Sequence, residues 1–148
     1  MIKDTNDLYY GEVRLKLKHF SEEDKAKGYV PAYHFAITDS CGREVGECDL
    51  RIGHNEKLYY GGNIGYRVFE EYRGHHYAGK AVKVLLKLAA KHEMGYVIIT
   101  CNPDNIASKK TCEYAGGELI ELAELPEDND MRIEKGETEK YIFRFEVG

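Results

Sequence analysis

The sequence lacks an excess of basic residues, a long apolar run and closely spaced cysteines. Its 148 residues carry a formal net charge of −5, which disfavours a nucleic-acid partner because such binding needs a basic surface. No stretch approaches the roughly 20 apolar residues of a membrane-spanning helix, and the polar first residues are not a signal peptide. These absences favour a cytoplasmic protein without a membrane partner.

The four cysteines, Cys41, Cys48, Cys101 and Cys112, show no C-x-x-C spacing. We expect free thiols in a reducing cytoplasm in preference to disulfides or a metal site. No linker, repeat or low-complexity block divides the chain, and a hydrophobic fraction of 43% is ordinary for a globular protein. We therefore expect one domain over residues 1–148 and no metal.

Hydrophobic periodicity predicts an α/β (α+β) chain. Alternating or β-branched segments predict strands over 12–18, 32–38, 45–52, 63–69, 96–100, 118–125 and 141–147. Helices are expected over 21–28, 78–95 and 106–115, and the acidic stretch 126–130 is expected to be a solvated loop. This order predicts a mixed, mostly antiparallel central sheet of about six to seven strands, with helices on both faces.

The most informative segment is the glycine-containing turn that precedes the longest predicted helix, from Tyr72 to Ala81. A helix start exposes backbone N–H groups that have no partner within the helix. Together with the positive end of the helix dipole, these groups form a phosphate site. The turn therefore predicts a phosphate-bearing ligand.

Residues Gly74 to Lys80 match the P-loop spacing G-x-x-x-x-G-K, so a P-loop-like nucleotide binder is one interpretation. A P-loop continues with Ser or Thr to hold magnesium, whereas this chain has Ala81. A P-loop also normally begins a domain, and here only about half of the chain follows it. The nucleotide-binding interpretation is therefore the less favoured one.

Segment 63–78 resembles motif A of the GNAT superfamily of acetyl-CoA-dependent N-acetyltransferases, R/Q-x-x-G-x-G/A. Arg73 matches its first position and Ala78 its last, whereas His76 stands where glycine is usual. A Cβ at that position restricts the approach of the backbone to a pyrophosphate. Residues 105–116, which begin with Asn105 and include Ser108, resemble the second helix of the family, N-x-x-S/A followed by glycine. The resemblance implies a GNAT-like fold.

The resemblance also implies acetyl-CoA as co-substrate. The pyrophosphate would rest on the turn, with Lys80 nearby, and the pantetheine arm would pair with the preceding strand and with Asn105. The implied cofactor contacts are Val68, Phe69, Arg73, Gly74, His75, His76, Tyr77, Ala78, Gly79, Lys80, Asn105 and Ser108. Two neighbouring strands, around Val68 and Thr100, would splay apart around the thioester, where a strand N–H can stabilise the oxyanion.

The sequence leaves the general base and the general acid open. Some relatives use a glutamate early in the fourth strand, where this chain has Asn63; Glu47 and Asp49 are candidates for the base or parts of a solvated face. Many relatives place a tyrosine where this chain has Cys112, so Cys112 and Tyr114 are candidates for the acid or packing residues. Relatives without that tyrosine act on ribosomal-protein N-termini and polyamines.

We therefore expect an N-acetyltransferase that transfers an acetyl group from acetyl-CoA to a primary amine of a small molecule or peptide by direct attack. A lysine-like amine, with a pKa of about 10.4, requires a base, whereas an α-amine near 8 needs only a water path. Acidic residues between Glu44 and Glu71 favour a cationic acceptor, and Tyr59, Tyr60 and Tyr66 are pocket or sheet-packing residues. A non-catalytic acyl-CoA sensor of the same fold is the alternative interpretation. The sequence is also compatible with a homodimer.

Overall fold

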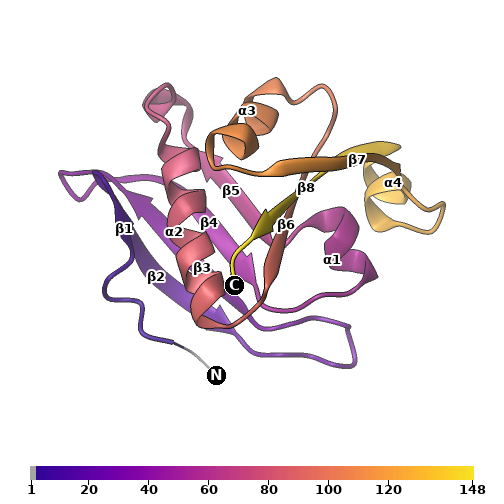
Figure 1. Ribbon diagram of the computed structural model, residues 1–148, viewed down its shortest axis with the longest axis horizontal. Helices are drawn as coiled ribbons and strands as arrows, with labels where there is room; N and C mark the ends of the chain where they lie inside the picture. The colour runs from indigo at the N-terminus through magenta and orange to yellow at the C-terminus, as the bar shows by residue number, and fades with distance from the viewer. Residues whose placement is uncertain (1–2) are drawn as a thin grey trace.

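The computed structural model describes residues 3–148, in which eight strands form two antiparallel sheets (Figure 1). The first sheet has the order β1–β2–β3–β4–β5, with the bounds Tyr9–Tyr10, Val13–Ser21, Ala32–Thr38, Glu44–Arg51 and Ile64–Val68. The second has the order β6–β8–β7, whose strands in chain order are Tyr96–Cys101, Glu118–Glu124 and Glu139–Glu146. Helices α1 to α4 span Glu56–Gly61, Tyr77–Lys91, Ile106–Tyr114 and Asp130–Lys135, and a 3-10 turn spans Glu70–Tyr72.

The predicted α+β fold with mostly antiparallel strands is confirmed, and helices lie on both faces of β6. Val97 and Ile99 join the core beneath α2, whereas Ile98 packs against Tyr59 and Tyr60 of α1. Successive strand residues point to opposite faces, so α2 and α1 cover opposite sides of this strand. The prediction of a strand over 96–100, in a sheet with helices on both faces, is therefore confirmed.

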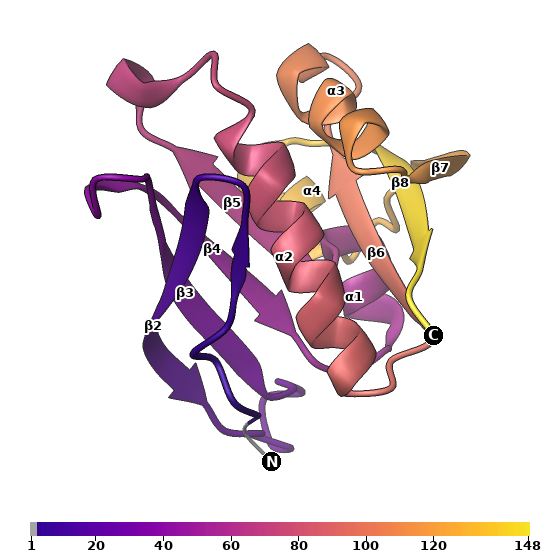
Figure 2. The ribbon, with the colours of Figure 1, turned by 60° about the vertical axis from the view of Figure 1, so that its left-hand side comes forward.

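Helix α2 crosses the first sheet with one fully buried face (Figure 2). Its buried residues recur at helical spacing and include Ala81, Val82, Leu85, Leu88 and Ala89. Each buried leucine or valine contributes roughly 1.5–3 kcal/mol through removal of apolar surface from water. In the described part of the chain, no helix packs on the opposite face of this sheet (Figure 2).

Strands β5 and β6 run in the same direction and diverge (Figure 2). Asn63 joins them at the narrow end, where its N–H donates to the Ile98 carbonyl (2.6 Å) and its Oδ1 accepts from the Ile98 N–H (2.9 Å). Its Nδ2 donates to the carbonyls of Arg51 (3.1 Å) and Gly53 (2.7 Å), so the side chain is fully used. Beyond this junction the strands belong to different sheets, where the sequence predicted one central sheet.

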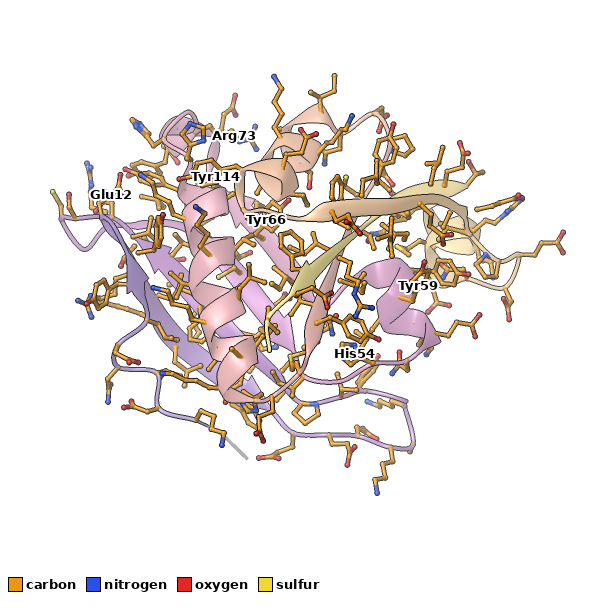
Figure 3. All side chains as sticks on the ribbon, in the orientation of Figure 1. Glu12, His54, Tyr59, Tyr66, Arg73 and Tyr114 are labelled. Atoms are coloured by element: carbon orange, nitrogen blue, oxygen red, sulfur yellow. The ribbon has the colours of Figure 1, made fainter. Side chains whose placement is uncertain are left out.

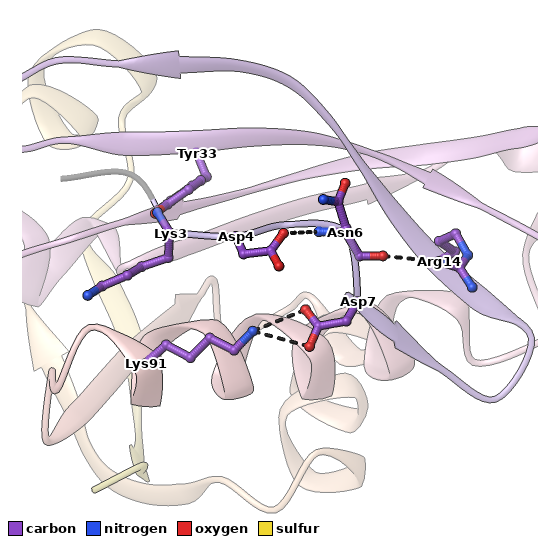
Figure 4. A network of polar contacts seen from close by, with 7 residues as sticks. All are labelled: Lys3, Asp4, Asn6, Asp7, Arg14, Tyr33 and Lys91. Carbon is purple, nitrogen blue, oxygen red and sulfur yellow. Dashed lines mark hydrogen bonds and ion pairs between the residues drawn. The ribbon is translucent and has the colours of Figure 1, made fainter.

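The segment before β1 is tied to both α2 and the first sheet (Figure 4). Lys91 of α2 pairs with Asp7 at 3.1 Å, and this ammonium lowers the pKa of the Asp7 carboxyl. The N–H of Lys3 donates to the Tyr33 hydroxyl at 2.7 Å. Leu8 is 2% exposed, so the segment also contributes to the core.

The predicted helix over residues 21–28 is wrong. Strand β2 continues to Ser21, and Asp24 forms an isolated antiparallel bridge with Tyr29 around a turn. Gly28 has a φ of 72° within this turn. A polar segment of this length cannot bury an apolar face, so the costly helix nucleus has no packing to offset it.

Two short helices were not predicted from the sequence. Helix α1 begins after Asn55, whose side chain accepts from the Leu58 N–H, and α4 begins after Asn129, whose side chain accepts from the Met131 N–H. Both are asparagine N-caps, which satisfy one backbone donor at a helix start. Helix α4 starts at the end of the acidic stretch predicted as a loop.

The four cysteines are free thiols, as predicted, with Cys41 exposed and the others buried. Residues 3–148 contain no cluster of His, Cys, Asp and Glu that could hold a metal ion. Nor does this part of the chain include a helix with the length and apolar character needed to cross a membrane.

Candidate active site

A cleft of about 800 Å³ opens where β5 and β6 diverge, between the start of α2 and helix α3. The structure brings most of the predicted cofactor contacts together at this cleft. Those that line it are Val68, Arg73, Gly74, His76, Tyr77, Ala78, Gly79, Asn105 and Ser108. Phe69, His75 and Lys80 are not among its lining residues.

The turn before α2 presents an uncapped helix start to the cleft. Gly74 has a φ of 94°, a conformation that glycine adopts readily, and nothing lies within 4 Å of the position of an added Cβ. His76 precedes the helix, and no side chain caps the first turn. The N–H of Lys80 donates to the His76 carbonyl (3.0 Å), so the N–H groups of residues 77–79 precede the intrahelical ladder. This geometry suits an anion.

His76, at the motif position usually occupied by glycine, adopts the left-handed conformation with φ 59° and ψ 25°. A non-glycine residue held there costs on the order of 1 kcal/mol. Its ring stacks on Tyr114 of α3, with centroids 4.8 Å apart. The side chain therefore joins the turn to α3, which partly offsets the backbone cost.

Tyr114 packs on the start of α2. A Cβ at Gly79 would lie 2.3 Å from the Tyr114 Cδ1, so glycine is what allows α2 and α3 to approach this closely. The Lys83 ammonium lies 4.8 Å from the Tyr114 ring centroid. The ring of this predicted acid candidate is thus held beside the turn, near Arg73 (Figure 3).

Lys80 faces the first hairpin. Its Nζ lies 2.7 Å from the Glu12 Oε1, in the turn between β1 and β2, and Glu12 lies on the other side of α2 from Tyr66 (Figure 3). This pairing raises the pKa of Lys80 and lowers the pKa of Glu12. The ammonium is therefore engaged by a carboxylate 68 residues away in sequence, which no local pattern could reveal.

Tyr66 reaches from β5 into the cleft toward α3. Its hydroxyl oxygen lies 2.5 Å from the Ser108 Oγ. Burial raises the pKa of Tyr66 well above its ordinary value, and burial raises the pKa of Cys112 to about 12. Both groups are therefore protonated at neutral pH. Of the two, Tyr66 lines the cleft.

Glu47 and Asp49 lie outside the cleft, on the other face of the first sheet. They line a second cavity of about 450 Å³. Its lining also includes Gly65, Tyr66 and Arg67, which border the cleft as well. The two hollows therefore adjoin along strand β5.

Comparisons with known protein families and solved structures agree with the fold described above. The family model described as "Acetyltransferase (GNAT) domain" matches residues 6–118, whereas no curated protein matches the chain. One similar solved structure is RimL, a ribosomal α-N-protein acetyltransferase in complex with coenzyme A (19% identity, TM-score 0.61, covering 82% of this chain and 64% of RimL).

Two further structures have the same fold. The microcin self-immunity acetyltransferase MccE, in complex with acetyl-CoA and AMP, shares 20% identity at a TM-score of 0.61, over 78% of this chain and 61% of the other. A ribosomal-protein-alanine acetyltransferase from Vibrio fischeri shares 18% identity at a TM-score of 0.60, over 78% and 62%. The chain thus spans less than two thirds of the length of these three structures. Because the family model covers most of the sequence, this chain belongs to the GNAT acetyltransferase family.

Proposed function

We propose that this protein transfers the acetyl group of acetyl-CoA to a primary amine, and that the acceptor is a peptide or small molecule. The observation that carries the proposal is the cleft between β5 and β6, which ends at the uncapped first turn of α2. The N–H groups of residues 77–79 would bind the pyrophosphate there. Arg73 would add a positive charge at the same place.

Two elements would hold the pantetheine arm. The Asn105 Oδ1 accepts from the Ser108 N–H (3.1 Å), so the Nδ2 is the atom proposed to donate to a carbonyl of the arm. Strand β5 would offer main-chain groups near Val68. The Arg73 Nε donates to the Val68 carbonyl at 3.3 Å, so this side chain must move for the carbonyl to pair with the arm.

Transfer would proceed by direct attack of the neutral amine on the thioester carbonyl. The C–N bond forms, the C–S bond breaks with its electron pair on sulfur, and one amine proton must leave while the thiolate gains one. We assign the second proton transfer to Tyr66, because its hydroxyl is protonated and borders the cleft. The tyrosine thus enters from β5, whereas many relatives place one at the position of Cys112.

The relatives also suggest the acceptor class. RimL and the Vibrio fischeri protein are described as acting on ribosomal proteins, the former on an α-amine. An α-amine, with a pKa near 8, is neutral in about one molecule in ten at pH 7, so it makes the smaller demand on a base. We propose a peptide α-amine as the first acceptor to test.

Measurements of ligand binding and of acetyl transfer distinguish this proposal from its alternatives. Acetyl-CoA at about 100 times its Kd is expected to stabilise the protein by about 2.7 kcal/mol, seen as a higher melting temperature. Thiol release from acetyl-CoA, measured over a panel of peptides and small amines, is expected to be acceptor-dependent. Stabilisation by ATP with magnesium and none by acetyl-CoA would contradict the proposal. Stabilisation by acetyl-CoA without turnover on any acceptor would favour a sensor.

Gly74→Val is expected to weaken acetyl-CoA binding by roughly tenfold or more while the protein still folds. Valine disfavours the φ of 94°, which displaces the turn, but open space surrounds the site. The matched control is Gly42→Val in the β3–β4 turn, where φ is 78° and the space is also open. Titration calorimetry should show a loss in the Gly74 variant alone, and equal affinities in two folded variants would refute the placement.

A further inference from the structure

Four residues form a row across the open face of the first sheet. The strand register places His19 of β2 opposite His34 of β3, His34 opposite Asp49 of β4, and Asp49 opposite Gly65 of β5. Opposite residues of paired strands lie on the same face. Tyr33 and Phe35, which flank His34, are in the core beneath α2, so the row faces away from that helix.

The row leaves a hollow at its β5 end. The rings of His19 and His34 stack with centroids 4.1 Å apart, and the Ser21 Oγ lies 3.2 Å from the His34 Nε2. The Asp49 carboxylate lies over Gly65, whose N–H donates to the Oδ1 at 3.0 Å. A Cβ at Gly65 would stand 3.2 Å from that oxygen, so glycine keeps the space open.

The hollow is part of the 450 Å³ cavity, which adjoins the cofactor cleft along β5. Gly65, Tyr66 and Arg67 border both spaces. The cleft is also lined by Arg51, on the face of the cavity, and β5 is the edge strand of its sheet, so an amine in the cavity reaches the proposed thioester position past the edge of β5. None of the predicted cofactor contacts lines the cavity, and Tyr66 is the one lining residue assigned a role toward the coenzyme A sulfur, so the remaining polar groups are available for a different ligand.

The charges around the hollow suit an ammonium joined to neutral carbonyl groups. Two carboxylates, Asp49 and Glu47, line the cavity together with the cations Lys18 and Arg67. Glu47 lies 3.9 Å from Arg67, and Asp49 lies 3.5 Å from Arg51 of the adjoining cleft. A peptide N-terminus offers this combination, because its ammonium is followed by peptide carbonyl oxygens. A lysine side chain offers the charge on a long apolar stem without adjacent carbonyls.

We propose that this cavity binds the N-terminus of a peptide acceptor, with Asp49 pairing with the ammonium, Arg67 donating to the first carbonyls and His34 removing the proton. This inference rests on the proposed function and names its acceptor site. The ammonium proton moves to an imidazole nitrogen of His34. The amine nitrogen then bonds to the acetyl carbon, and the sulfur leaves with its electron pair and takes the Tyr66 proton, while the second amine proton restores Tyr66.

The protonation of His34 supports this role. Burial lowers the pKa of His34, His19 and Arg51 lower it further, and Asp49 opposes them. The ring is therefore neutral at pH 7 and can accept a proton. An α-ammonium, whose ordinary pKa is near 8, gives up a proton to this ring more readily than a lysine ammonium, whose ordinary pKa is about 10.4. The site thus selects α-amines over lysine side chains.

The first experiment measures kinetics with two probes, the tripeptide Ala-Ala-Ala amide and Nα-acetyl-lysine amide. The wild-type protein is expected to prefer the tripeptide. Asp49→Asn should raise the tripeptide KM about tenfold or more, because an ammonium loses its charged partner. His34→Gln should lower kcat and remove the acidic limb of its pH profile. Both variants should keep the wild-type affinity for acetyl-CoA.

The matched control is His54→Gln. His54 is exposed and stacks on Tyr96 away from the cavity, so tripeptide kinetics should be unchanged. Gly65→Ala is a second probe of the site, since its Cβ enters the hollow and should raise the tripeptide KM. An unaltered KM in folded Asp49→Asn and Gly65→Ala proteins, or a wild-type preference for the lysine probe, would overturn the inference.

A binding measurement separates the acceptor site from the catalytic proposal. A tripeptide labelled with fluorescein at its C-terminus is titrated with the protein saturated with coenzyme A, and its anisotropy is recorded. Binding that Asp49→Asn abolishes would support the site even if no acetyl transfer occurs. Binding that is equal in the wild-type and Asp49→Asn proteins would reject the site whether or not transfer is observed.

Discussion

Gly79→Ala is expected to weaken acetyl-CoA binding by roughly tenfold or more. The new methyl group would stand 2.3 Å from the Tyr114 Cδ1, so α3 must move away from the helix start that forms one end of the cleft. Overpacking of this kind costs about 1–3 kcal/mol, and the better helix propensity of alanine returns at most about 1 kcal/mol. Titration calorimetry and thermal unfolding would record both effects.

Two further variants make this expectation specific. In the double variant Gly79→Ala with Tyr114→Ala the clashing ring is gone, so affinity should be higher than in Gly79→Ala alone, a strongly non-additive pair. Gly61→Ala is the control, because Gly61 borders the same cleft and nothing lies within 4 Å of its added Cβ. Additive losses in the double variant, or an equal loss in the control, would show that the α2–α3 contact does not shape the cleft.

Tyr66→Phe is expected to lower kcat about 100-fold, which is typical of the loss of a general acid. Affinity for acetyl-CoA should stay within a few fold, because the ring and its packing remain. The lost hydrogen bond to Ser108 should cost about 1 kcal/mol of stability. Steady-state thiol release, binding and thermal unfolding measure these three quantities separately.

The controls for Tyr66 are two other tyrosines. The Tyr59 hydroxyl donates to Glu121 on the surface at 2.6 Å, away from the cleft, so Tyr59→Phe should leave kcat unchanged. Tyr114→Phe tests one of the two acid candidates that the sequence offered. A large loss of kcat in Tyr114→Phe, together with normal turnover in Tyr66→Phe, would return the acid role to Tyr114.

Local sequence predicted the start of α2 well and the electrostatic surroundings of its first turn poorly. The glycines and the following apolar periodicity depend on neighbouring residues alone, so the start of α2 could be predicted to within a residue. The engagement of Lys80 depends on Glu12, which comes from a hairpin of another part of the chain. The motif alone therefore could not show that the Lys80 ammonium lies away from the cleft.

The row of His19, His34, Asp49 and Gly65 could not be predicted for a similar reason. Alternation correctly put Glu47 and Asp49 on one face, but the partner of Asp49 depends on the register of three strands. A bulge between Leu17 and His19 shifts that register, and it is what brings His19 opposite His34. Likewise, the sequence shows that Asn63 cannot act as a base, because an amide side chain does not take up a proton. Only the structure shows its role at the junction of β5 and β6.

The position of β5 between two hollows has a kinetic consequence. In the proposed arrangement the thioester occupies the cleft and the acceptor the adjoining cavity, so neither ligand lies across the entrance of its companion. Each can then arrive or depart first. Such an arrangement gives a ternary complex with random order of addition, and the acetyl group passes between the substrates without a stop on the protein.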